Sequence, residues 1–361
     1  MAKVDEPFRS RIAKESVRSK WIAASIPRIL WGPAGRGTAL AKALASLYET
    51  KQLRDLPPGP TIVFNSTDLI TGKVFEMSRD VVGSSEHQWQ PTPAKLPLSV
   101  AVAASAAFPL SRAIVRLKLK DLGYGEIPLP ALSLVDGGVY DNLGLDWFSI
   151  ANWGDLGLKP HADFLVLVNA SGTLNVRYGR TGVLRRGALR YGGLRLLPRT
   201  IEIQYAQTLA PRIAGFHENY GRPPYHGIYL WLPGNPRTFL ESGLKPNILS
   251  TIGPSQEPMV EALARGALDN HLAFLLSRVR TDLDKFSRTE ADLLSYHGYW
   301  STHAELTFFK PELALSQPRW VCPDWATPTQ GTRAALEADL ERASHRFLRR
   351  LRGPTGRLLF R

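Results

Sequence analysis

The chain has 361 residues, of which 44% are hydrophobic and 21% charged, a composition typical of a globular protein with a sizeable core. Its 45 Lys and Arg against 32 Asp and Glu give a formal net charge of +13, which favours an anionic partner such as a phospholipid surface or a nucleic acid. The single cysteine excludes an intramolecular disulfide, and no paired-Cys or paired-His spacing suggests zinc, so we expect no metal and no cofactor.

The first twenty residues are mixed in charge and lack the apolar stretch of a secretory signal. The least charged stretch, residues 96–111, is shorter than the ~20 residues of a membrane span and contains Pro97 and Pro109. We therefore expect this stretch to be buried core, and we expect a cytoplasmic or peripheral-membrane protein.

In chain order, a helix is predicted after Thr38, which can act as its N-cap, with core positions at Leu40, Ala41, Leu44, Leu47 and Tyr48. β-Rich runs predict strands at 61–64, 132–135, 164–168 and 228–232. Because helical stretches separate several of these runs, we expect an α/β architecture whose parallel strands are covered on both faces.

Two more helices are predicted towards the C-terminus. Ser287 and Glu290 fit a capping box that begins a short helix, and Gly298 is expected to end it. The second helix spans 333–352. It has an apolar stripe with basic residues beside it: Leu336, Leu340, Phe347 and Leu351 form the stripe, and Arg342, Arg346, Arg349 and Arg350 flank it. This stripe either packs on the domain or enters a lipid interface. With the Arg/Gly-rich residues 177–195, this helix supplies much of the basic excess, which suits an anionic membrane or a solvated basic face.

Three stretches carry the candidate chemistry: "FNSTDLITGKVFEM" (64–77), "VAVAASAAFPL" (100–110) and "LSLVDGGVYDNLG" (132–144). Asn65 and Ser66 let the chain turn, and the small residues of the second stretch permit close backbone approach. Gly137 and Gly138 can take φ values that other residues resist. We therefore expect Asp136 at the C-terminal end of a strand, on a glycine turn, facing a cleft at least in part. Alone, an Asp-Gly pair is common in ordinary turns.

Together and in this order, the three stretches resemble the patatin-like phospholipases, lipid acyl hydrolases with similar N-x-T-D-x-x-T-G, A-S-x-A-F-P and D-G-G/A segments. Residues 279–299 are similar to the closing region of bacterial members, and the resemblance covers most of residues 30–300. It implies a three-layer α/β/α fold with a mostly parallel central sheet, and a phospholipid or other acyl lipid as substrate. It also implies a Ser-Asp dyad in which Asp136 is the proton acceptor, with Gly137 and Gly138 completing its motif.

The sequence departs from the family in two motifs. Neither the G-x-S-x-G elbow of the nucleophile nor the glycine-rich oxyanion loop occurs in the 361 residues. Two stretches come nearest to the elbow. Residues 31–40 have no serine between their glycines, and residues 252–258 lack the closing glycine. Ser105 belongs to a different motif and is expected to be structural. The chain is therefore expected to be incomplete at its N-terminus, one part of a split protein, or a degenerate member without hydrolase activity.

The resulting prediction assigns 1–160 to the C-terminal part of a patatin-like catalytic core, 161–310 to its continuation with closing helices, and 311–361 to a basic extension. The predicted function is a lipid acyl hydrolase that keeps its aspartate base but not its nucleophile. A non-catalytic lipid- or partner-binding module is the alternative. Nucleic-acid binding rests on charge and Arg/Gly content alone, because no recognition motif accompanies them.

Overall fold

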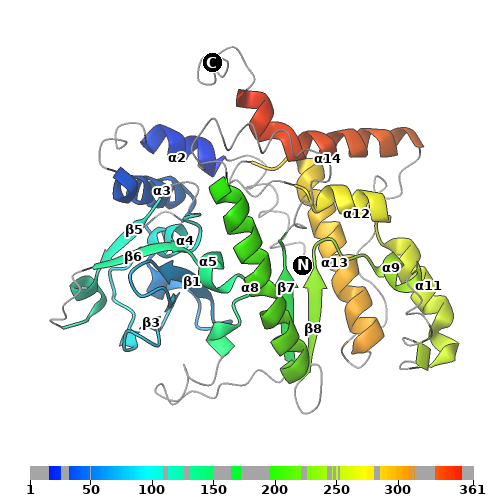
Figure 1. Cartoon of the computed structure of the whole chain (residues 1–361), viewed down its shortest axis with the longest axis horizontal. Coiled ribbons are helices and arrows are strands. Elements are labelled where there is room, and N and C mark those ends of the chain that lie inside the picture. Colours follow the sequence, from blue (N-terminus) through cyan, green and yellow to red (C-terminus); the bar gives the residue numbers. More distant parts are fainter. Residues whose placement is uncertain are drawn as a thin grey trace. The chain divides into compact units, whose positions relative to one another are not determined.

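The computed structural model describes residues 16–25, 32–48, 50–108, 113–125, 131–148, 164–171, 196–220, 226–241, 246, 249–250, 253–279, 285–310, 313 and 330–351. The chain divides into two compact units (Figure 1). The sheet unit comprises 17–163 and 176–225, and the helical unit comprises 1–16, 164–175 and 226–361. Each unit has a hydrophobic core of its own.

The sheet unit is built on a six-stranded sheet in the order β4-β3-β2-β1-β6-β5. Its strands are β1 (Val63–Asp68), β2 (Val74–Ser78), β3 (Val81–Gly83), β4 (Gln90–Pro91), β5 (Val115–Lys118) and β6 (Ala131–Asp136). Every neighbouring pair is antiparallel. The prediction of a three-layer α/β/α fold with a mostly parallel central sheet is therefore wrong.

The reason lies in the connections. β1, β2 and β3 follow one another through turns too short for the crossover that parallel neighbours need, so they pair as hairpins. In the first turn Gly72 has a φ of 69°, and its N–H donates to the carbonyl of Asp68 at 2.8 Å. The Asp68 carboxylate accepts hydrogen bonds from the Thr71 hydroxyl at 3.0 Å and from the Ser133 N–H of β6 at 3.3 Å. The D-x-x-T-G part of the first motif thus makes a hairpin turn and ties it to β6.

Helices α2 (Val17–Ser25), α3 (Gly32–Tyr48), α4 (Leu98–Ser105) and α8 (Leu196–Tyr220) complete the sheet unit with the short α5 (Gly138–Asp141). Leu40 and Leu44 of α3 are buried in its core, as predicted. The helix begins at Gly32, however, so Thr38 lies inside it and is not its N-cap. The prediction that 96–111 is buried core is confirmed for Ala101, Ala103, Ala104 and Ala107, which are fully buried. It is wrong for Pro97 and Phe108, which are exposed, and Pro109 lies outside the described residues.

The helical unit contains the parallel pair β7 (Phe164–Asn169) and β8 (His226–Trp231), which confirms the strands predicted at 164–168 and 228–232. β7 is covered on one face only, because Val166 and Val168 are 44% and 56% exposed. The expectation that parallel strands are covered on both faces is therefore wrong for β7. The helices of this unit are α9 (Pro236–Glu241), α11 (Glu257–Gly266), α12 (Asn270–Leu276), α13 (Arg288–Phe309) and α14 (Gln330–Leu351).

α13 begins as predicted and ends later than predicted. The capping box is present, with the Ser287 hydroxyl accepting from the Glu290 N–H at 3.1 Å. Gly298 does not end the helix, which continues to Phe309. Its buried face also continues past Gly298, through Ala304 and Phe308, and this packing outweighs the weak helix propensity of one glycine.

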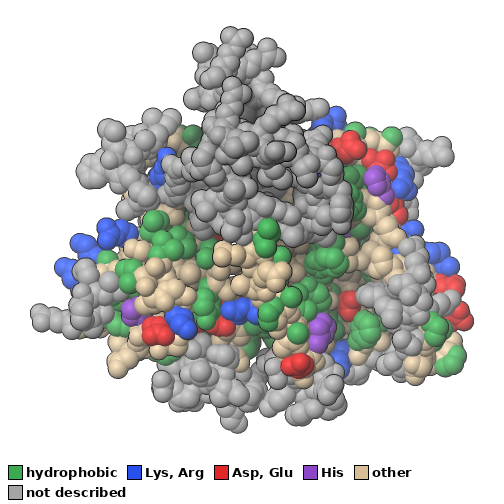
Figure 2. All heavy atoms as spheres, in the orientation of Figure 1, with side chains coloured by type: hydrophobic (Ala, Val, Ile, Leu, Met, Phe, Trp, Pro, Cys, Tyr) green, Lys and Arg blue, Asp and Glu red, His purple; other side chains and the backbone are tan. Residues whose placement is uncertain are grey.

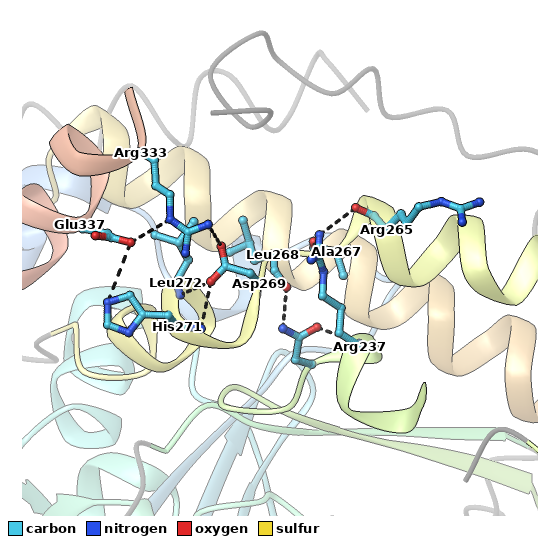
Figure 3. A network of polar contacts seen from close by, with 10 residues as sticks. Arg237, Arg265, Ala267, Leu268, Asp269, His271, Leu272, Arg333 and Glu337 are labelled. Atoms are coloured by element: carbon cyan, nitrogen blue, oxygen red, sulfur yellow. Dashed lines mark hydrogen bonds and ion pairs between the residues drawn. The ribbon is translucent and has the colours of Figure 1, made fainter. Parts of the chain in front are cut away.

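α14, the predicted C-terminal helix, begins at Gln330 rather than 333 and is docked on α12 and α13. Leu336 and Leu340 are buried in the core of the helical unit, so this part of the apolar stripe packs on the protein. Figure 3 shows Arg333 contacting both Glu337 and Asp269, the N-cap of α12, at 3.0 Å each. The side chains of Phe347 and Leu351, like residues 177–195, lie outside the described part. Among the helices described, none is both long enough and apolar enough to cross a membrane.

We predict that Leu340→Ala destabilises the helical unit by about 2–5 kcal/mol, because it removes a fully buried side chain from a packed core. Arg342→Ala, on the exposed face of the same helix, is the control and should change stability by less than about 0.5 kcal/mol. Urea denaturation followed by circular dichroism measures both. Equal, small effects would contradict the burial of this stripe.

Candidate functional site

Asp136 is the last residue of β6, which confirms the predicted strand end. It pairs across the sheet with Ser66 of β1. The chain then turns directly into α5, whose first residue is Gly138. Whether Asp136 faces a cleft stays a prediction.

Gly137 is required for a reason other than the predicted one. Its φ of −61° and ψ of −31° are helical values that any residue adopts, so the prediction of an unusual backbone conformation is wrong at this position. A Cβ atom on Gly137 would instead lie 2.4 Å from the carbonyl oxygen of Asn65. The turn after Asp136 therefore passes so close to the main chain of β1 that no side chain fits between them.

The three motif stretches meet at Asp136. The N–H of Asp136 donates to the carbonyl oxygen of Ala107, which follows α4, at 3.0 Å. The hydroxyl of Thr67 in β1 donates to the carbonyl oxygen of Asp136 at 3.0 Å. The first and second motifs thus each hydrogen-bond to the main chain of Asp136, which belongs to the third.

The Asp136 carboxyl is partly buried, and its Oδ1 accepts a hydrogen bond from the N–H of Gly138 at 2.8 Å. Burial raises the pKa of Asp136 above its ordinary value, while the hydrogen bond from Gly138 opposes that rise. An aspartate with a raised pKa is a better base than one in water, where the ordinary pKa is about 3.9. The site therefore suits a proton acceptor.

No serine hydroxyl of the described residues bonds to this carboxyl. Ser66, its neighbour across the sheet, is fully buried and donates its hydroxyl to the carbonyl oxygen of Phe75 at 2.9 Å. Ser105 is the last residue of α4 and is half-buried. The structure brings the candidate base together with its neighbouring motifs, but it brings no candidate nucleophile to the base.

An ionic clamp that sequence reasoning missed holds the segment after Asp136. Arg212 of α8 lies 3.0 Å from a carboxylate oxygen of Asp141 and 3.0 Å from one of Asp146. It also donates to the carbonyl oxygen of Tyr140 at 3.0 Å and lies over the ring of that residue. Burial raises the pKa of Asp141, while hydrogen bonds from Asp146 and Leu143 and the charge of Arg212 act in the opposite direction. No sequence spacing pairs Arg212 with this segment, so only the fold reveals the clamp.

A second missed residue is Glu76 of β2, which pairs with Asn65 of β1. Glu76 is fully buried, and neither of its carboxyl oxygens has a hydrogen-bond partner; the side-chain oxygen of Asn65 is also buried without one. Burial, and then the charges of Asp146 and Asp141, raise the pKa of Glu76 to about 8. A pKa of about 8 favours the neutral acid form of Glu76 at pH 7.

The described residues contain no group of three or more His, Cys, Asp or Glu side chains placed to hold a metal ion. In comparisons with known proteins, no family model, no curated protein and no solved structure matches the chain. The resemblance to the patatin-like phospholipases therefore rests on the sequence motifs alone.

We predict that Gly137→Ala destabilises the sheet unit by about 1–3 kcal/mol, because the new methyl group overlaps the main chain of Asn65. Gly125→Ala is the matched control, since a Cβ atom there meets nothing within 4 Å. Thermal unfolding of the two variants measures the difference. Equal stability of the two would show that the turn does not cross β1 this closely.

We predict that Glu76→Gln removes a pH dependence of stability. A folded-state pKa raised to about 8 contributes stability that is fully present below the unfolded pKa near 4.5 and is lost as the pH rises through 8. Between pH 5 and 8 the wild type should thus lose stability relative to E76Q, on the order of a few kcal/mol. The melting temperatures of the two proteins across this pH range measure the loss. E86Q, at an exposed position, is the control. Parallel curves for wild type and E76Q would contradict a buried neutral acid.

Proposed function

We propose that this chain carries the proton acceptor of a patatin-like lipid acyl hydrolase, that Asp136 is that acceptor, and that the substrate is a phospholipid or another acyl lipid. One observation supports the proposal: of three motifs with the family's order in the sequence, the first and the second each hydrogen-bond to the main chain of Asp136 in the third. An ordinary Asp-Gly turn needs neither of the other two motifs.

The proposed reaction is ester hydrolysis, in which Asp136, with its raised pKa, is the base. Asp136 takes the proton of a serine hydroxyl while the serine oxygen bonds to the ester carbonyl carbon, and the proton then passes to the departing alcohol. Water then gives its proton to Asp136 while its oxygen bonds to the carbonyl carbon of the acyl-serine ester. The bond to the serine oxygen breaks, the proton passes from Asp136 to that oxygen, and the fatty acid leaves. No elbow motif carries this serine within these 361 residues, and the proposal therefore includes a nucleophile supplied by a further segment or chain. No histidine takes part.

The proposal does not rest on the fold class, because the antiparallel sheet differs from the parallel sheet that the resemblance implies. It rests on the local geometry at the end of β6. A second candidate function, a non-catalytic lipid- or partner-binding module, is favoured by a different observation. The serine hydroxyl nearest in register to Asp136, that of Ser66, is already bonded to the main chain of β2.

We also propose peripheral contact with an anionic membrane, supported by the net charge of +13. A basic side chain near such a surface contributes about 1 kcal/mol. Because Leu336 and Leu340 are in the core, the contact is electrostatic in that part of α14 and does not insert those residues. Basic and acidic side chains are mixed on the described part of the face drawn in Figure 2.

We predict that the purified chain does not hydrolyse phospholipids or p-nitrophenyl esters. A version extended through in-frame coding sequence upstream of Met1, if that sequence carries the serine elbow and the glycine-rich loop, should hydrolyse them, and Asp136→Asn should return activity to background. Asp80→Asn, at a side chain that is 65% exposed, is the matched control and should leave activity unchanged. Hydrolysis by the present chain, or activity that survives D136N, would contradict the proposal. An upstream sequence without either motif would favour the binding module.

A further inference from the structure

Thr67 occupies a special position next to Asp136. It is the fifth residue of β1 and only 4% exposed, and it pairs with Val135, the neighbour of Asp136. A hydroxyl buried to this extent is stabilising only when it is hydrogen-bonded, and the Thr67 hydroxyl is bonded twice.

The two bonds span the turn after β6. The hydroxyl donates to the carbonyl oxygen of Asp136 at 3.0 Å and accepts from the N–H of Tyr140 at 3.1 Å. One bonded group belongs to the last residue of the strand and the other to α5. A single side chain therefore fixes the distance between the two ends of the segment that contains Gly137 and Gly138.

The carboxyl group of Asp136 depends on that segment. Its hydrogen bond comes from Gly138, which lies between the two groups that Thr67 holds. The turn also has internal bonds, because the N–H groups of Tyr140 and Asp141 donate to the carbonyl oxygen of Gly137 at 3.1 and 2.9 Å. These bonds do not connect the turn to β1. Outside the turn, Ala107 accepts from the N–H of Asp136, and Arg212 donates to the carbonyl oxygen of Tyr140. Among the hydrogen bonds of the described residues, only those of the Thr67 hydroxyl oxygen connect one atom of β1 to both Asp136 and Tyr140, the two sides of the turn.

We propose that Thr67 is the positioning residue of Asp136, and that its hydroxyl holds the turn of residues 136–140 so that the carboxyl stays partly buried and bonded to Gly138. This placement stands on the geometry. Its meaning for catalysis rests on the proposed function. Serine at position 67 can make the same two bonds, whereas valine has the shape of threonine without the hydroxyl.

The test compares Thr67→Val and Thr67→Ser with a matched control. Thr92 is a fully buried threonine of the same unit, and its hydroxyl donates to the carbonyl oxygen of Ser78 at 2.8 Å; no hydrogen bond of Thr92 in the described part of the chain reaches β6 or α5. Thr92→Val therefore removes a comparable hydrogen bond at a distance in sequence from the site. The pKa of Asp136 is read from the ¹³C resonance of its labelled carboxyl, which is identified by its absence in D136N.

In T67V the turn loosens, water reaches the carboxyl and the hydrogen bond from Gly138 weakens. Burial has the larger influence on the pKa of Asp136, so this pKa should fall towards that of an ordinary aspartate. It should stay at the wild-type value in T67S and in T92V. Thr67→Ala is a second variant, so the result does not depend on how a valine fits. An unchanged or higher pKa of Asp136 in T67V and T67A would overturn the proposal, as would an equal fall in T92V.

The measurement needs no enzymatic activity, so its failure is distinct from failure of the proposed function. In the extended, active form, T67V should lower kcat and leave KM unchanged, because the base is misplaced while substrate contacts remain. T67S should restore kcat. A fall in the pKa of Asp136 without any activity in the extended form would support Thr67 as a positioning residue and contradict the hydrolase.

Discussion

The close crossing of two main-chain segments determines the rest of the site. Gly137 passes over Asn65 at a distance that leaves no room for a Cβ atom, and this contact brings the end of β6 against β1. In this position the Thr67 hydroxyl bonds to both sides of the turn, and the main-chain N–H of Asp136 donates to the carbonyl oxygen of Ala107. The glycine is thus required for approach and not for backbone freedom.

Charge is distributed unevenly around this crossing. Asp136 and Glu76 are both carboxyl groups whose pKa is raised, mainly because burial disfavours their charged forms. Burial raises the pKa of Asp141 as well, but Asp141 and Asp146 differ from these two in sharing the guanidinium of Arg212, which gives each a partner of opposite charge. The same short stretch of chain therefore carries one carboxyl suited to accepting a proton, and two that hold the segment in place.

The sequence predicted local structure better than the fold. The strand runs at 132–135, 164–168 and 228–232, and the capping box at Ser287, appear in the structure because they depend on neighbouring residues alone. The prediction that the central sheet is mostly parallel was wrong. The Asp68–Gly72 segment forms a hairpin turn, which makes the neighbouring strands antiparallel, and the pattern of strand residues does not reveal such a turn.

The candidate site divides in the same way. Asp136 and its glycines stand out in the sequence, whereas Arg212 and Glu76 act through contacts between distant segments that no spacing predicts. The central claim is that the three motifs meet at Asp136 through main-chain hydrogen bonds. Amide hydrogen exchange measured by NMR tests it most directly. The N–H of Asp136 donates to the carbonyl oxygen of Ala107, and that of Tyr140 is shared between the Thr67 hydroxyl and the carbonyl oxygen of Gly137. Both N–H groups should exchange as slowly as those in the interior of the sheet. Exchange at the rate of an exposed loop at both positions would contradict the account.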